Sequence, residues 1–138
     1  MMPRKLRLAA FAFAIAGIMI ITGTTAATPV DGTWAIRDLI LDIYGCQNLV
    51  CGRVAWTKDP KRRQADCGRT IVWGLSPSGP SEWDGGSIYD PTDGNTYRLK
   101  ATLNPDGTLH ARIFRGLPVF EKTEILRRVA AGSQSGWC

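Results

Sequence analysis

The chain has 138 residues, with 17 Lys and Arg against 12 Asp and Glu and a formal net charge of +5. Three of the basic residues and none of the acidic ones lie within residues 1–27, so the 111 residues of 28–138 hold 14 basic and 12 acidic residues, a net charge of +2. This balance excludes the strongly basic surface of a nucleic-acid-binding domain, and 111 residues allow one small domain only.

Residues 1–27 have the three parts of a secretory signal peptide. A positive start (Arg4, Lys5, Arg7) precedes fourteen residues, 8–21, that lack any charged or polar side chain, and Thr25-Ala26-Ala27 is suited to cleavage. The apolar run is shorter than the roughly 20 residues that span a bilayer, so we favour cleavage over a retained membrane anchor. We therefore predict a signal peptide at 1–27, one exported domain at 28–138, and no transmembrane span after cleavage.

The four cysteines, Cys46, Cys51, Cys67 and Cys138, all lie in the predicted exported domain. An even number of cysteines in a small exported domain is typical of disulfides, and four cysteines allow three pairings. We favour Cys46–Cys51 with Cys67–Cys138, because the first two flank a four-residue hairpin loop and can lie opposite each other. Their spacing matches a zinc site poorly and lacks the C-x-x-C of a redox centre. We expect no metal and no cofactor.

Short apolar runs separated by turn residues predict about eight strands and no helix in residues 28–138. In chain order the runs are 32–36, 39–44, 49–57, 70–75, a hairpin at 82–99 that supplies two strands, 108–115, and 119–129. Residues 58–66 are expected to form a polar irregular loop, and residues 76–81 a turn or flexible loop. Many short strands with regular turn signals are typical of a small closed barrel or a sandwich.

The hairpin at 82–99 has the clearest pattern in the chain. Residues 90–94, DPTDG, contain the proline, aspartates and glycine of a tight turn. After the turn, Tyr97, Leu99, Ala101 and Leu103 alternate with polar residues. This period of two indicates a strand with one buried face.

Residues 83–97, WDGGSIYDPTDGNTY, resemble the central motif of the DUF2147 family of small exported bacterial proteins. Gly32-Thr33-Trp34, residues 51–56, and residues 116–120 followed by Arg128 also resemble that family. The resemblance implies an all-β fold, a small antiparallel eight-stranded lipocalin- or calycin-like barrel, in the bacterial periplasm or secreted. It also implies that Trp34 stacks on Arg128 or its neighbour Arg127 across one end of the barrel. It implies no activity.

Aromatic side chains are the best candidates for ligand contact, because Trp and Tyr offer an apolar wall with a polar tip. If the barrel is hollow, we expect its lining to include Trp56, Trp83, Tyr89 and Tyr97. The leading hypothesis is a non-catalytic barrel that binds a small hydrophobic or amphipathic ligand. The alternative is a barrel filled by its own side chains, acting as a structural or interaction protein of the cell envelope.

The loop at residues 58–66 contains a run of basic residues that could bind a partner. It suggests contact with an anionic envelope surface through Lys61, Arg62 and Arg63. The more common role of such a run is a solvated loop.

A carboxylate-dependent hydrolase is the weakest hypothesis. Four acidic residues surround the central hairpin, namely Glu82, Asp84, Asp90 and Asp93. Turn formation accounts for them more simply. The single histidine, His110, gives no basis for a catalytic triad or a multi-histidine metal site, and we predict that the protein is not an enzyme.

Overall fold

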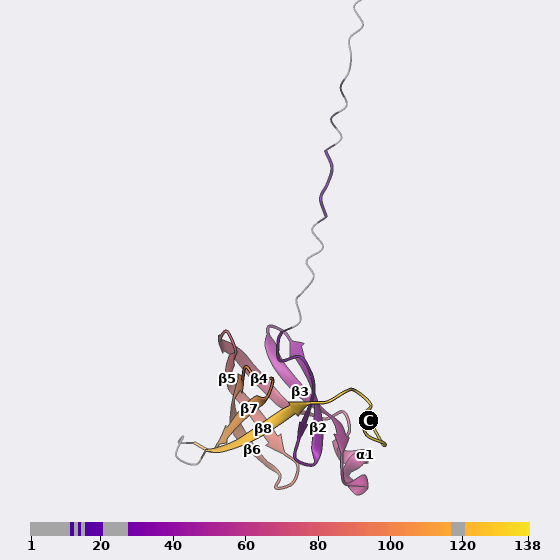
Figure 1. Ribbon diagram of the computed structural model, residues 1–138, viewed down its shortest axis with the longest axis vertical. Coiled ribbons are helices and arrows are strands. Elements are labelled where there is room, and N and C mark those ends of the chain that lie inside the picture. Colours follow the sequence, from indigo (N-terminus) through magenta and orange to yellow (C-terminus); the bar gives the residue numbers. More distant parts are fainter. Residues whose placement is uncertain (1–11, 13, 15, 21–27, 117–120) are drawn as a thin grey trace, which may run out of the picture.

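Eight antiparallel strands, each paired with the next in sequence, close into one barrel in the computed structural model of the chain (Figure 1). The structure describes residues 12, 14, 16–20, 28–116 and 121–138. The strands are β1 (Gly32–Ile36), β2 (Leu39–Cys46), β3 (Leu49–Thr57), β4 (Thr70–Gly79), β5 (Glu82–Asp90), β6 (Asn95–Leu103), β7 (Leu109–Phe114) and β8 (Lys122–Arg128). The predicted all-β, eight-stranded barrel is therefore confirmed.

The predicted signal peptide falls largely outside the described residues, which omit 1–11, 13, 15 and 21–27. It stays a prediction. The expected last strand at 119–129 also begins in undescribed residues, and its described part is β8. None of the helices in the described ranges has the length and apolar character that crossing a membrane requires.

The end of the barrel where β1 begins is closed by one aromatic residue. Trp34 is fully buried, and its Nε1 donates to the carbonyl of Val30, 2.9 Å away. Trp34 pairs with Arg128 where β1 meets β8, and the Arg128 guanidinium carbon lies 4.3 Å from the centroid of the indole ring. Arg128 is thus the partner that Trp34 finds, as the resemblance implied, while Arg127 pairs with Ala35.

Strand β4 is longer than the sequence pattern predicts, because the SPSG segment at 76–79 continues it instead of forming a turn. Ser76 pairs with Asp84 and Pro77 with Trp83, both on β5. The last pair between β3 and β4 is Val50 with Leu75, so beyond Leu75 the strand has a partner on one side only. An edge position tolerates proline, which cannot donate to a ladder.

The segment between β3 and β4 contains a 3-10 turn, η1 (Pro60–Arg62), and one turn of helix, α1 (Arg63–Asp66), instead of the expected irregular loop. The Asp59 carboxylate accepts from the Lys61 N–H at 2.9 Å, and Pro60 occupies the first turn. Aspartate followed by proline is a helix-start signal, so the prediction of no helix was wrong for a reason that the sequence contains.

The two disulfides are those that the sequence favoured. Cys46 is bonded to Cys51 with Cα atoms 6.0 Å apart, and Cys67 to Cys138 with Cα atoms 5.4 Å apart. The hairpin inside the first bridge has a two-residue turn, not a four-residue loop, because Cys46 pairs with Leu49 and Gln47 and Asn48 both have positive φ. The second bridge holds the C-terminus beside α1 (Figure 1).

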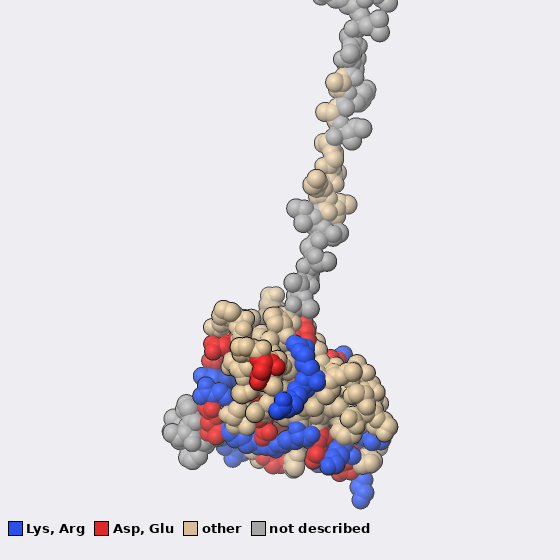
Figure 2. Space-filling view, viewed as in Figure 1, with Lys and Arg blue, Asp and Glu red and all other residues tan. Residues whose placement is uncertain are grey.

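Charges of both signs alternate on the outer surface. On this surface Arg112 of β7 is paired with Glu121 at 2.6 Å, and Arg53 of β3 with Asp42 of β2 at 2.8 Å. Figure 2 accordingly shows Lys and Arg next to Asp and Glu, not in a broad patch of one sign.

Candidate functional site

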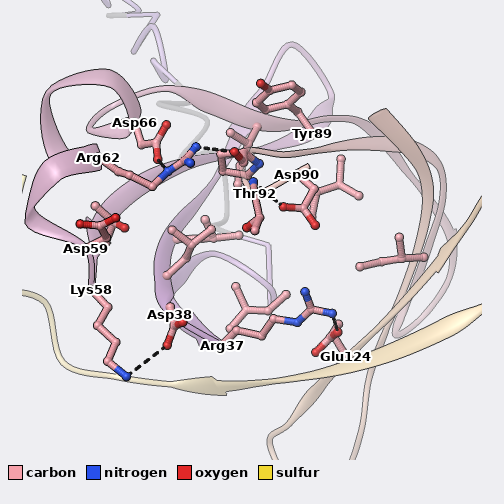
Figure 3. Close-up of a pocket in the computed structure, with 18 of the residues that line it drawn as sticks. Arg37, Asp38, Lys58, Asp59, Arg62, Asp66, Tyr89, Asp90, Thr92 and Glu124 are labelled. Carbon is pink, nitrogen blue, oxygen red and sulfur yellow. Dashed lines mark hydrogen bonds and ion pairs between the residues drawn. The ribbon is translucent and has the colours of Figure 1, made fainter. Parts of the chain in front are cut away.

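The end of the barrel opposite Trp34 opens into a cavity of about 780 Å³. Its wall combines the β1–β2 turn, the start of β2, the segment 57–66, the β5–β6 turn, and residues of β7 and β8 (Figure 3). Pockets for small molecules commonly enclose about 300–1,000 Å³. At this end the barrel therefore has room for a small molecule.

The deep part of the cavity is apolar. Aliphatic side chains from five strands line it: Ile36, Leu39, Leu41, Ile71, Ile88 and Ile113. Leu41 and Ile71 are each 1% exposed, so they also belong to the packed core below. Such a wall favours hydrocarbon, because a polar group placed there would lose its hydrogen bonds to water.

The rim of the cavity carries nine charged side chains, four basic and five acidic. Three ion pairs cross or follow the opening: Arg37 with Glu124 and Lys58 with Asp38 at 3.6 Å (Figure 3), and Lys122 with Glu124 at 3.5 Å. The hydrogen bond to Glu124 raises the pKa of Arg37, so its guanidinium stays charged. The opening is thus a charged ring above an apolar chamber.

Arg62 ties two sides of the rim together. Its Nε donates to Asp66 at 2.9 Å, and its Nη2 donates to the carbonyl of Pro91 in the β5–β6 turn. Asp66 is only 1% exposed, so Arg62 is the cation that compensates a buried carboxylate. The hydrogen bond to Asp66 raises the pKa of Arg62. This contact holds the segment 57–66 against β5 and β6.

Tyr97 lines the cavity from β6, on the same face as the buried Leu99. Its hydroxyl donates to the carboxylate of Asp93, which also accepts from the Asn95 N–H at 2.8 Å. This hydrogen bond lowers the pKa of Asp93 and raises that of Tyr97. Arg115 lies 5.3 Å from the ring centroid. Tyr97 is therefore a well-anchored part of the wall.

The sequence pattern of a bacterial family, described as "Uncharacterized protein conserved in bacteria (DUF2147)", matches residues 32–128. The chain belongs to the DUF2147 family. The matched residues run from the start of β1 to the end of β8, so they cover the whole barrel. This confirms the family that residues 83–97 suggested.

Among solved structures, the DUF2147 chain is similar to the protein HP1028 from the human pathogen Helicobacter pylori, which is described as belonging to the lipocalin family. The TM-score is 0.60 at 15% sequence identity, over 72% of this chain and 82% of that chain. At this identity the likeness shows the fold alone, a lipocalin-like barrel. A comparison with curated proteins gave no match.

Trp56, expected in the lining, lies outside the barrel. The register of β2 with β3 shifts between Ile40 and Leu41, so that Ile40 pairs with Trp56 but Leu41 pairs with Val54. This bulge reverses the alternation and turns Trp56 outward. There its Nε1 donates to the carbonyl of Ser135, 2.9 Å away in the C-terminal tail.

Trp83 also differs from the expectation, whereas Tyr89 is among the residues that line the cavity. A register shift in β5 between Trp83 and Gly86 turns Trp83 inward, but toward the closed end, where it is 4% exposed beside a void of only about 20 Å³. Tyr89 borders the rim, yet its ring points away from the chamber (Figure 3) and the Arg69 guanidinium lies 4.1 Å from its centroid. Of the four expected residues, Tyr97 and Tyr89 therefore line the cavity, Tyr97 from its wall and Tyr89 from its rim.

The basic loop does not form one exposed surface. Lys61 is exposed, but Arg62 turns to the rim and Arg63 is half-buried. A Cβ added to Gly136 of the tail would overlap the Arg63 guanidinium, so tail and side chain are in close contact. The three residues therefore have three different surroundings.

The carboxylates of the central hairpin are held by neighbouring N–H groups. Asp84 accepts from Gly85 at 2.6 Å and Asp90 from Thr92 at 2.8 Å, in addition to the bonds of Asp93. The remaining member, Glu82, is exposed on β5. Within the described ranges no group of three or more His, Cys, Asp or Glu could hold a metal ion. His110 pairs with Thr102 and does not line the cavity.

Proposed function

We propose that this DUF2147 protein is an exported, non-catalytic binding protein that holds one small amphipathic molecule in its barrel. The apolar part of the ligand lies between the aliphatic side chains of the chamber, and its polar end lies at the charged rim. The observation that carries the proposal is the cavity of about 780 Å³, apolar below and charged above.

The chemistry of the wall supports this ligand class. Burying a methylene contributes about 0.8 kcal/mol, so a chain of eight would contribute about 6 kcal/mol before the entropic cost of binding. A fully apolar ligand would leave no partner for the rim, and a fully polar one would meet six aliphatic side chains. An amphipathic molecule matches both parts.

Two further observations support binding without catalysis in an exported protein. The hairpin carboxylates Asp84, Asp90 and Asp93 each accept a hydrogen bond from a neighbouring backbone N–H, which gives them a structural role in their turns. Two disulfides in one small domain favour an oxidising compartment, in agreement with the signal-like sequence at 1–27.

A cavity-filling substitution tests the proposal. N-phenyl-1-naphthylamine is neutral and becomes fluorescent in apolar surroundings, so saturable 1:1 fluorescence enhancement reports entry into the chamber. We expect Ile113→Trp, in the cavity wall, to abolish it. The matched control is Ile125→Trp, because Ile125 is 48% exposed on the outer face of β8.

Native mass spectrometry of protein released gently from the exporting cell complements this titration. A discrete extra mass that disappears on denaturation is expected. Absence of saturable probe binding by the wild type, or equal binding by Ile113→Trp, would overturn the proposed function.

A further inference from the structure

The basic side chains at the rim are already occupied. Each of the four among the described lining residues is in an ion pair: Arg37 with Glu124, Lys58 with Asp38, Arg62 with Asp66, and Lys122 with Glu124. Arg62 additionally donates to the Pro91 carbonyl. An anionic head group would have to displace a carboxylate of the protein from its cation, or lie beside that carboxylate.

Two of the acidic side chains at the rim form no ion pair. Within residues 28–116 and 121–138, Asp59 and Asp90 have no basic side chain within ion-pair distance. Asp59 caps the turn that begins at Pro60. Asp90 uses Oδ1 to accept from the Thr92 N–H, and its Oδ2 accepts no hydrogen bond from the described residues.

Asp90 is placed to meet a ligand. It ends β5 two residues after the buried Ile88, and alternation puts both on the inner face. It is half-buried among the residues that line the cavity, and it lies across the opening from Lys58 and Asp38 (Figure 3). Arg37 lies close enough to feel the charge of Asp90 but is ion-paired with Glu124, so a cation at Asp90 would gain a carboxylate without breaking an existing ion pair.

We propose that the ligand is an alkylammonium amphiphile, monocationic or zwitterionic, whose ammonium group lies against Asp90. This rests on the proposed function, since it assigns the head group of the molecule held in the barrel. The hydrocarbon chain occupies the chamber below, and the nine charges of the rim sum to −1, which matches a single positive head. An alkyl carboxylate of the same length meets a rim whose cations are taken.

A series with one tail and different heads tests this inference. Dodecyltrimethylammonium, dodecylphosphocholine, dodecanol and dodecanoate are titrated below their micelle concentrations against protein loaded with N-phenyl-1-naphthylamine, at neutral pH and low salt. We expect the two ammonium compounds to displace the probe at concentrations about tenfold lower than dodecanoate does. Salt should reduce this preference because it screens exposed charges.

The isosteric variant Asp90→Asn tests whether Asp90 is the residue that binds the ammonium group. Asparagine retains the acceptor for the Thr92 N–H, so the turn is preserved while the charge is lost. We expect the preference for ammonium over dodecanoate to fall to within about twofold of unity. Asp42→Asn removes the same charge on β2, where Asp42 pairs with Arg53 and does not line the cavity, and should leave the preference unchanged.

The outcomes separate the two proposals. Equal displacement by all four compounds, tighter binding of dodecanoate, or a preference that survives Asp90→Asn would overturn the head-group inference while leaving the binding function standing. Failure of the wild type to bind the probe and every compound would overturn both.

Discussion

The guanidinium of Arg128 lies 4.3 Å from the centroid of the Trp34 indole and covers the closed end of the barrel. It also donates to the backbone carbonyls of Asp31, at 2.9 Å, and Pro29. One side chain of the last strand thus fastens the first strand and the segment before it. The cavity lies at the other end of the same eight strands.

Removing that side chain should destabilise the fold. We expect Arg128→Ala to lower the free energy of unfolding by about 1–2 kcal/mol, because it loses the cation–π contact and two hydrogen bonds. Urea denaturation followed by tryptophan fluorescence measures the change. Arg127→Ala is the matched control, and it should stay within about 0.5 kcal/mol of wild type. Equal effects of the two substitutions would contradict the role of Arg128.

Gly32 makes room for Arg128. Its φ is +132°, and a Cβ added there would lie 2.8 Å from Nη1 of Arg128. We expect Gly32→Ala to destabilise the protein by about 1–3 kcal/mol, since both the backbone and the contact are strained. Gly45→Ala is the control, because a Cβ added at Gly45 has no atom within 4 Å and the φ of Gly45 is not positive. Its free energy of unfolding, measured by urea denaturation, should equal that of the wild type or be slightly higher.

The contact of Arg62 with Pro91 and Asp66 should slow ligand release. We expect Arg62→Met to speed dissociation of N-phenyl-1-naphthylamine roughly 3–10-fold and to lower the melting temperature, because Asp66 is left buried without its cation. Stopped-flow fluorescence measures the rate. Lys61→Met removes the neighbouring charge from an exposed position and should change neither quantity. Identical rates in the two variants would argue against a tie across the opening.

The bond between Tyr97 and Asp93 predicts a pH dependence. The pKa of Asp93 is held below its usual 3.8, so this stabilisation is present at higher pH and is lost as the pH falls through the folded-state pKa. The pKa of Tyr97 is held above its usual 10.0, so its stabilisation is present at lower pH and is lost as the pH rises through its folded-state pKa.

We therefore expect Tyr97→Phe to lower the melting temperature most at neutral pH. The difference from wild type should shrink below about pH 4 and above about pH 10. Calorimetry across this range measures it. Tyr44→Phe, whose hydroxyl lies 3.5 Å from the Thr70 hydroxyl, is the control and should show no change on the acid side. A constant Tyr97→Phe difference at every pH would rule out the ionic part of the bond.

The two disulfides should contribute unequally. Residues 71 positions apart are joined by Cys67–Cys138 and residues five apart by Cys46–Cys51. Restriction of the unfolded chain predicts losses of about 4 and about 2 kcal/mol when each pair is replaced by serine. Denaturation of the two double-serine variants gives both values. Loss of the longer bridge should also release the tail from Trp56, seen as a red shift of its fluorescence.

Much of the fold could be predicted because it depends on local pattern. The run at 49–57 matches β3 residue for residue, and Leu99 and Ala101 are buried as alternation requires. The disulfide partners and the meeting of Trp34 with Arg128 also agree with the expectation. The Asp59-Pro60 start of the short helical segment is also a local signal, although we predicted an irregular loop there.

The residues of the candidate site were harder to predict from the sequence, because β-bulges decide whether a side chain points into the barrel or out of it. Trp56 turns outward after the shift at Ile40 and Leu41, and Trp83 turns inward through the shift before Gly86. A bulge arises from the fit of two strands, and one extra residue reverses every side chain beyond it.

By itself the sequence determined the strands, their order, the family and the closure of one end, because periodicity, turn chemistry and short motifs are local properties. Only the tertiary structure decided that the other end is hollow, that Trp56 and Trp83 do not line it, and that Asp90 has no ion-pair partner among the described residues. Those features depend on contacts such as Arg37 with Glu124, 87 residues apart, and on the strand register that brings such residues together.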